Sequence, residues 1–380
     1  KCHMHDVWDQ CLRTSGYVAR RAEAEAFNRA HRFKKRGVAM IPVKFGLAFT
    51  HAPLNQAGAL AMVYTDGTVL INHGGCEIGQ GLHTKMAQIA ASALRIPLSL
   101  VHVSDTTTDK VPNTSATAAS MQADLNGMAV LDACTQIRAR LDAFARTLPA
   151  PPASWEALVA AAYNHRIDLS AHGFYGAEYG YDFKRHVGKV FAYYTYGAAC
   201  SEVEVDTLTG EHTVLRADVV MDLGKSLNPA LDIGQIEGAF VQGMGWSTYE
   251  QILYDHRGQL FSRGPGTYKV PGPGDVPAEF NVALLKDSCN PYAVHSSKGV
   301  GEPPLYLGQV VFWAIHEAVR AARADHGITG YNQMTLPATV ERIRLACRDQ
   351  FTDPPGICRE PTCYIEEYPC TPDVLVPKEH

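Results

Sequence analysis

Short apolar runs separated by turn residues recur along this chain, and they predict β-hairpins with helices between them. The clearest hairpin spans residues 58–73, where two apolar runs flank Thr65-Asp66-Gly67, because Asp-Gly between apolar runs favours a tight turn. A second hairpin is predicted for residues 191–223 and a small one around residues 255–258. Residues 38–43 and 98–104 have the apolar content of further strands.

Helical periodicity is clearest in residues 307–326, where Val310, Val311, Ala314, Ile315 and Ala318 fall on one side. Further helices are predicted for residues 6–33, 82–94, 118–148, 155–163 and 232–253. Helices and hairpins are intermixed and do not follow a strict strand–helix–strand series, so the predicted fold class is α+β. Residues 149–152, which read Pro-Ala-Pro-Pro, are the most linker-like stretch, although they also fit a surface loop within one domain.

Composition narrows the class of protein. A net charge of −5 over 380 residues gives no electrostatic reason to expect nucleic acid or an anionic membrane as a partner. No apolar run reaches the ~18 residues of a membrane span, and the first residues do not resemble a signal peptide. The ten cysteines include no Cys-x-x-Cys pair, which predicts free thiols in a reducing, cytoplasmic compartment and no zinc or iron–sulfur site within this chain.

A glycine-rich loop follows the first hairpin. Residues 73–81 read His-Gly-Gly-Cys-Glu-Ile-Gly-Gln-Gly and lead into a predicted helix, so free backbone N–H groups at the helix start are expected to face an anionic ligand. Gln80 adds an amide that both donates and accepts hydrogen bonds. Glycines also serve plain tight turns, but four in this stretch favour the interpretation as a cofactor loop.

Two further stretches contain candidate binding residues. Residues 111–120 are small or hydroxylated and precede a predicted helix; helix capping is the favoured interpretation, and a flat surface for a ligand is the alternative. In the helix predicted for residues 232–253, Gly234, Gly238 and Ala239 are expected to admit a closely packed element. The amides of Gln235 and Gln242 need partners, either in the core or on a cofactor.

Glu302 lies between Gly299 and Gly301 on one side and Pro303 and Pro304 on the other. Proline is expected to hold the preceding residue in the extended region, and the glycines allow close approach of a bound group. A stiffened, desolvated carboxylate suits general-base chemistry. From this segment alone, a catalytic base and an ordinary loop glutamate are equally good interpretations.

Together these stretches resemble the molybdenum-cofactor domain of the xanthine dehydrogenase/oxidase family, from about residue 35 to residue 351. The resemblance is carried by the motifs at residues 44–50, 54–59, 74–86, 111–120, 200–204 and 298–305. It implies a helical lead-in (1–36), two parts of a molybdopterin-binding unit (37–150 and 151–352, the second with the catalytic Glu) and a C-terminal tail (353–380).

The resemblance also implies roles for particular residues. Glu302 matches a base that takes a proton from a molybdenum-bound hydroxyl, whose oxygen attacks a purine carbon while hydride passes to a sulfur on the metal. Hypoxanthine is thereby oxidised to xanthine, and xanthine to urate. By the same match, the purine pocket contains Phe49, Thr50, Leu54 and Ala118, Ala119 lies beside the metal, and the molybdopterin is bound by Gly79, Gln80, Thr117, Ala119, Ser120, Gln235, Lys298 and Gly301.

Other features of that family are not encoded in this sequence. The family's FAD domain, its two 2Fe–2S modules and the first half of its molybdenum domain have no counterpart here, so remaining domains or partner chains are expected, together with a homodimer. The choice between NAD and oxygen as electron acceptor is made at the absent flavin site. Aldehyde oxidase is the nearest alternative, but Pro303-Pro304, Phe49-Thr50 and the residue 117–119 loop favour the purine enzyme. A non-catalytic truncated product is the other alternative.

Overall fold

The computed structural model describes residues 1–349, 351 and 352, so the predicted tail at residues 353–380 lies outside the described residues. The strands are β1 (Lys34–Leu47), β2 (Gln56–Val63), β3 (Val69–His73), β4 (Val101–Val103), β5 (Ser170–Gly176), β6 (Gly180–Asp182), β7 (Val187–Lys189), β8 (Tyr193–Asp206), β9 (His212–Asp222) and β10 (Glu279–Leu284). The helices are α1 (Met4–Thr14), α2 (Tyr17–Ala30), α3 (Leu82–Leu94), α4 (Gln122–Ala145), α5 (Trp155–Asn164), α6 (Pro229–Thr248), α7 (Pro303–Leu307), α8 (Val310–Asp325) and α9 (Val340–Cys347).

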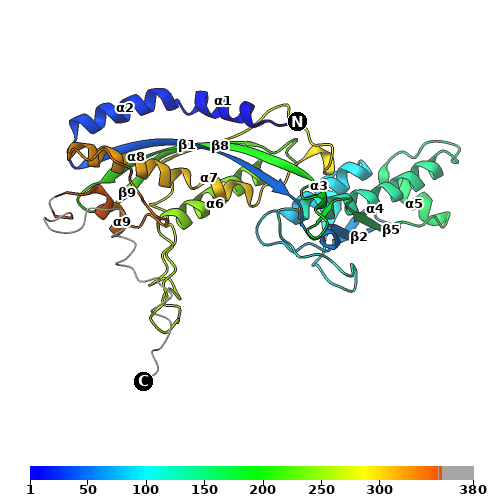
Figure 1. The fold of residues 1–380 in the computed structure, drawn as a ribbon. Coiled ribbons are helices and arrows are strands. Elements are labelled where there is room, and N and C mark those ends of the chain that lie inside the picture. Colours follow the sequence, from blue (N-terminus) through cyan, green and yellow to red (C-terminus); the bar gives the residue numbers. More distant parts are fainter. Residues whose placement is uncertain (350, 353–380) are drawn as a thin grey trace, which may run out of the picture.

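The larger lobe is built on a four-stranded sheet in the order β1-β8-β9-β10, in which only β10 runs parallel to its neighbour. Helices α1 and α2 cover one face, and α8 lies against the other with α6 and α7 beside it (Figure 1). Each face has its own apolar core, one around Val7 and Cys11 of α1 and one around Phe240 of α6 and Ile315 of α8. The sheet is therefore buried on both sides, which explains apolar runs such as residues 38–41 in β1 and 219–221 in β9.

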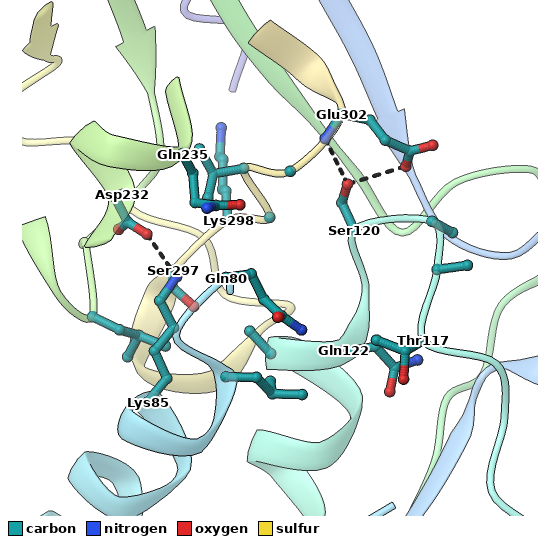
Figure 2. Close-up of a pocket in the computed structure, with 18 of the residues that line it drawn as sticks. Gln80, Lys85, Thr117, Ser120, Gln122, Asp232, Gln235, Ser297, Lys298 and Glu302 are labelled. Atoms are coloured by element: carbon teal, nitrogen blue, oxygen red, sulfur yellow. Dashed lines mark hydrogen bonds and ion pairs between the residues drawn. The ribbon is translucent and has the colours of Figure 1, made fainter. Parts of the chain in front are cut away.

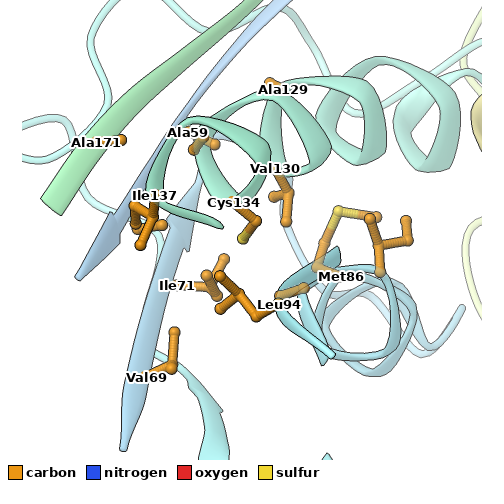
Figure 3. Packing of buried hydrophobic residues seen from close by; sticks show 14 of the residues in the cluster. Ala59, Val69, Ile71, Met86, Leu94, Ala129, Val130, Cys134, Ile137 and Ala171 are labelled. Carbon is orange, nitrogen blue, oxygen red and sulfur yellow. The ribbon is translucent and has the colours of Figure 1, made fainter. Parts of the chain in front are cut away.

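The smaller lobe contains a sheet in the order β4-β3-β2-β5 packed against α3, α4 and α5. Figure 3 shows this core, where Ile71 of β3 faces Leu94 of α3 and Cys134 of α4. Strand β5 follows the proline-rich stretch at residues 149–152, yet it pairs with β2, which precedes that stretch. Strands from both sides of the stretch thus share one sheet.

The β1–β8 pair joins the two lobes. Its antiparallel register is unbroken from Lys34↔Asp206 to Leu47↔Tyr193, and Figure 1 shows both strands running from one lobe to the other. Leu47 and Tyr193, at the far end, belong to the core of the smaller lobe. The same pair of strands therefore contributes to both cores and fixes one lobe against the other.

Most of the predicted elements are confirmed. The α+β class, both large hairpins and the helix at Leu82–Leu94 are as expected, and an isolated bridge between Tyr254 and Leu260 marks the small hairpin. The single helix predicted for residues 6–33 is wrong: Gly16, with φ +66°, separates α1 from α2. Among the described helices, none combines the length and hydropathy needed to cross a membrane.

Three predicted boundaries are also wrong. The helix expected from residue 118 begins at Gln122, and the helix expected to reach residue 253 ends at Thr248. Residues 98–104 hold a turn of 3₁₀ helix followed by the short β4.

A close approach of α8 to β1 generates the first prediction. A Cβ on Gly37 would lie 1.9 Å from the carbonyl oxygen of Ala314, and overpacking of this kind costs about 1–3 kcal/mol. We expect Gly37→Ala to lower the free energy of unfolding by at least about 1 kcal/mol, measured by urea titration. Gly264→Ala is the matched control, since nothing lies within 4 Å of its added Cβ, and equal stability of the two variants would contradict the packing argument.

The second prediction concerns His73, at the end of β3 and 1% exposed. Its Nδ1 accepts the N–H of Gly75 at 3.1 Å, so its proton lies on Nε2, 2.9 Å from Nδ1 of His83. Burial, followed by the charge of His83, lowers the pKa of His73 to about 4. The unfolded chain takes up this proton near pH 6.5 and the folded chain does not, so stability is complete above pH 6.5 and falls as the pH drops towards 4.

Between pH 7.5 and pH 5, His73 should therefore remove about 2 kcal/mol from the free energy of unfolding. His73→Asn keeps an acceptor for Gly75 and lacks the titrating ring, so its stability should fall less over this interval. Urea titrations of both proteins at the two pH values measure the difference. Parallel loss of stability in the two proteins would rule the assignment out.

Candidate active site

A cavity of about 300 Å³ lies where the two lobes meet, a volume at the lower end of those that hold small ligands. Four segments form its wall: the glycine loop with α3, the loop before α4, the start of α6, and the loop that ends at Glu302 (Figure 2). The lining residues are Ile78, Gln80, Leu82, Lys85, Thr117, Ala118, Ala119, Ser120, Gln122, Ala123, Leu227, Asp232, Gln235, Ser297, Lys298, Gly299, Val300, Gly301 and Glu302.

Most of the residues proposed for the site from the sequence lie around this one cavity. They are Gln80, Thr117, Ala118, Ala119, Ser120, Gln235, Lys298, Gly301 and Glu302. Gly79, Phe49, Thr50 and Leu54 are not part of the wall. Phe49 is half-buried and is held through its backbone, since its N–H donates to Oδ1 of Asn55 at 2.9 Å and its carbonyl accepts from Nδ2 at 2.7 Å.

Glu302 stands at the rim of the cavity, and Ser120 holds it in place. The Ser120 hydroxyl donates to Oε2 of Glu302 at 3.0 Å and accepts the backbone N–H of Glu302 at 2.8 Å. Figure 2 shows the two side chains facing each other. One hydroxyl therefore fixes both the backbone and the carboxylate of the predicted base.

Two expectations about Glu302 are wrong. Its backbone is helical, with φ −83° and ψ −35°, because the chain turns directly into α7 and the Glu302 carbonyl accepts the N–H of Leu305 at 3.0 Å. This hydrogen bond and the turn into α7 outweigh the preference for extended backbone that the following proline imposes. The residue is also exposed, so nothing in the described residues desolvates its carboxylate.

The start of α3 is not open to an anion, contrary to the expectation from the glycine loop. The Glu77 carboxylate accepts the N–H groups of Gly79, Gly81 and His83 at 2.9–3.0 Å. Burial alone would raise the pKa of Glu77, but these N–H groups together lower it below the usual range. The Glu77 carboxylate therefore occupies the N–H groups at the start of α3 that an anionic ligand would need.

Gln80 is also bonded within the glycine loop. Its Oε1 accepts the N–H of Ile78 at 2.7 Å, and its Nε2 donates to the carbonyl of Cys76 at 2.9 Å. These bonds hold the amide in a defined orientation at the cavity wall and leave it one further donor and one further acceptor position.

The hydroxyl-rich loop at residues 111–120 does not cap α4, so that interpretation is wrong. The residue before α4 is Met121, which makes no side-chain capping bond. Instead Thr117 accepts the N–H of Cys76 at 2.9 Å, and Ser115 donates to the carbonyl of Gln56 at 3.2 Å. The hydroxyls tie this loop to neighbouring loops, while Ala119 and Ser120 adopt left-handed φ values of +55° and +54°, a strained conformation typical of functional loops.

The glycines of α6 at which another element was expected to pack closely have no such neighbour. Nothing lies within 4 Å of a Cβ added at Gly234 or Gly238, so no element packs closely there. Close packing occurs one turn later, where a Cβ on Gly243 would lie 1.8 Å from the carbonyl of Leu305 in α7. Gln235 is half-buried in the cavity wall, whereas Gln242 is exposed.

Lys298 presents its aliphatic chain, and not its charge, to the cavity. The ammonium donates to Oδ2 of Asp222 at 2.6 Å and to the carbonyl of Tyr194 at 3.0 Å, and neither partner lines the cavity. The cation is thus neutralised within the larger lobe.

A buried ion pair in the cavity wall was missed by the sequence analysis. Nζ of Lys85 in α3 lies 2.6 Å from Oδ1 of Asp232 in α6, and the Ser226 hydroxyl donates to the other oxygen of Asp232 at 2.6 Å. Figure 2 shows the pair bridging the two helices. A signal was present, because Lys85 shares the apolar face of its helix with Leu82 and Met86.

The wall therefore offers amides and hydroxyls, one exposed carboxylate and charges that are already paired. Among residues 1–349, 351 and 352, no three His, Cys, Asp or Glu side chains come together to hold a metal ion. A metal at this cavity must bring most of its ligands with it, as it does on an organic cofactor.

Comparisons with known proteins show relatives of this chain. Xanthine dehydrogenase from Dictyostelium discoideum is 55% identical over 352 residues, which are 92% of this chain and 26% of that protein. Xanthine dehydrogenase/oxidase from Rattus norvegicus is 55% identical over 348 residues, 91% of this chain and 26% of that protein. The chain thus spans about a quarter of the length of these relatives.

Solved structures share the fold at lower identity. CO dehydrogenase from Oligotropha carboxidovorans has a TM-score of 0.76 and 22% identity, covering 90% of this chain and 45% of that one. Aldehyde oxidoreductase from Desulfovibrio gigas has a TM-score of 0.75 and 24% identity, covering 91% and 36%. The family model of the molybdopterin cofactor-binding domain matches residues 10–277, and the chain belongs to that family.

Proposed function

We propose that this chain forms one part of the molybdenum site of a xanthine dehydrogenase/oxidase, which oxidises hypoxanthine to xanthine and xanthine to urate. The observation that carries the proposal is Glu302, held by two hydrogen bonds to Ser120 at the rim of a cavity lined by amides and hydroxyls. The relatives at 55% identity named xanthine dehydrogenase support the purine substrate.

The cavity wall suits a pterin-based cofactor. Gln80, Thr117 and Gln235 provide neutral donors and acceptors for its polar edges, and Gly301 and Ser120 complete this set. The small side chain of Ala119, in the strained turn, would leave room for the metal. When bound, the cofactor supplies molybdenum that accepts two electrons from the purine.

Glu302 acts as the general base. Because Oε2 accepts from Ser120, Oε1 is the atom that accepts the proton given up by the attacking oxygen. The Ser120 hydroxyl keeps the carboxylate aimed during this transfer. The role of Gly79 is to let the loop turn directly before Gln80, because its φ of +102° favours glycine.

We assign the purine-binding residues to Ala118, which lines the cavity, and to Phe49, Thr50 and Leu54, which lie outside its wall. Asn55 fixes the backbone of Phe49 from both sides, so the ring has a defined place on which a planar heterocycle can stack. Thr50 is exposed beside it and offers a hydroxyl to the polar edge of the purine.

Remaining domains complete the enzyme. We assign FAD and two 2Fe–2S clusters to them, since this chain spans about 26% of its relatives, and we place the assembled homodimer in the cytoplasm. The described cysteines are all free thiols, which is typical of a reducing compartment. Aldehyde oxidation is less favoured, because the aldehyde oxidoreductase structures are no more than 24% identical and speak only for the fold.

The third prediction tests the base. In the enzyme assembled from this chain and the remaining domains, Glu302→Gln should lower kcat for urate formation by about 10²–10⁴-fold, the usual contribution of general-base catalysis. Molybdenum content should stay at the level of the unaltered enzyme. Glu211→Gln, at an exposed position of the larger lobe, is the matched control. Unchanged urate production by Glu302→Gln would overturn the proposal, and an inactive unaltered enzyme would favour a non-catalytic product.

The fourth prediction concerns the serine that holds the base. Ser120→Ala removes a hydrogen bond to a carboxylate, which is worth about 1.5–3 kcal/mol, so kcat should fall about tenfold or more. KM for xanthine should change by less than about threefold, because Ser120 holds the base and not the purine. Steady-state kinetics measure both constants. Ser247→Ala, which removes a hydroxyl bonded inside α6, is the control, and a kcat equal to the control's would argue against this role.

A further inference from the structure

The loop that carries Glu302 is anchored to strand β8 at Gly299, three residues before the base. The Gly299 N–H donates to the Tyr193 hydroxyl at 2.8 Å, and the Gly299 carbonyl accepts from the Thr195 hydroxyl at 3.3 Å. Both side chains come from one face of β8, since they are two residues apart. Both are buried, with exposed fractions of 7% and 0%.

The opposite side of the loop is closed by Ser120. A Cβ on Gly299 would lie 2.4 Å from the carbonyl oxygen of Ser120, and a Cβ on Gly301 would lie 2.9 Å from its hydroxyl. Only glycine fits at this distance, so residues 299–301 are confined between β8 and the loop before α4. A shift of Gly299 therefore moves Glu302 with it.

Asp124, in the first turn of α4, orients the Tyr193 hydroxyl. Oδ2 of Asp124 accepts from that hydroxyl, while Oδ1 is buried and has no hydrogen-bond partner in the described structure. Burial raises the pKa of Asp124 to about 7, against the hydrogen bond from Tyr193 and the charge of Lys85.

The proton of Tyr193 stays in place at neutral pH. Burial and the neighbouring Asp124 raise the pKa of Tyr193 well above its ordinary value. The phenol therefore donates to Asp124, and the lone pairs of its oxygen are left to face the N–H of Gly299.

We propose that Tyr193, oriented by Asp124 and assisted by Thr195, is a positioning residue that sets the place of the Glu302 carboxylate. This inference rests on the proposed role of Glu302 as the base. Neither Tyr193 nor Asp124 lines the cavity, so both act through Gly299 and not by contact with a ligand.

The test uses the assembled enzyme and two independent readouts. Tyr193→Phe keeps the ring and removes the acceptor of the Gly299 N–H. It should lower kcat for xanthine at least fivefold, leave KM within about twofold and leave molybdenum content unchanged. Hydrogen–deuterium exchange should speed up at least tenfold in the peptide that spans residues 298–302, because its anchored amide loses its partner.

Variants of Asp124 separate positioning from general stability. Asp124→Asn still offers an oxygen to the Tyr193 hydroxyl and should retain most of kcat, whereas Asp124→Ala should match Tyr193→Phe. Tyr249→Phe is the control for loss of a phenol. Tyr249 directly follows α6, and its hydroxyl lies 3.1 Å from Nε2 of His212 in β9. The kcat and the loop exchange of this variant should equal those of the unaltered enzyme.

Unchanged exchange of residues 298–302 in Tyr193→Phe would overturn the inference, whatever its kcat. Should that variant not fold, Thr195→Val replaces it with the same expected effects on exchange and kcat. Failure of the proposed function is distinguishable: an unaltered enzyme without purine turnover rejects the function, while the exchange measurement still decides whether Tyr193 anchors the loop.

Discussion

The antiparallel pairing of β1 with β8 is the constraint on which the rest of the molecule depends. It runs without a break to Leu47↔Tyr193 and contributes to the cores of both lobes. Tyr193, Tyr194 and Thr195 then hold the loop before Glu302 through Gly299 and Lys298. Because side chains alternate between faces, a slip of one residue would turn Tyr193 and Thr195 away from that loop. The register of a sheet thus determines the position of the proposed catalytic carboxylate.

Apart from the exposed carboxylate of Glu302, the charges at the cavity are neutralised by partners within the protein. Glu77 occupies the N–H groups at the start of α3, Lys298 is paired with Asp222, and Lys85 with Asp232. Buried charges of this kind are stable only when they are paired and hydrogen-bonded. What remains for a ligand is a set of amides and hydroxyls, together with the Glu302 carboxylate. Such a wall selects by hydrogen-bond pattern and shape, which suits a polar, ring-shaped cofactor more than a bare ion.

Local patterns in the sequence predicted the helices and turns that depend on neighbouring residues alone. The helix at Leu82–Leu94 and the hairpin turning at Asp66-Gly67 follow from periodicity and turn chemistry, and the motifs led to the residues around the cavity. The partners of the polar groups did not follow. Ser120 meets Glu302 across 182 residues, and Lys85 meets Asp232 across 147. Local rules therefore assigned Ser120 to capping and Glu302 to an extended backbone, whereas these distant contacts decide otherwise.

Orientation and desolvation of the proposed base are separable in this molecule. Ser120 and the Gly299 anchor already hold the carboxylate of Glu302, although it is exposed to water in the described residues. Preorganised hydrogen bonds act most strongly where water is excluded, so a second wall is needed to realise their effect. Given a chain that spans about a quarter of its relatives, that wall belongs to the remaining domains in the proposed enzyme. In the proposed enzyme, this chain orients the carboxylate of Glu302, and the remaining domains must exclude water from it.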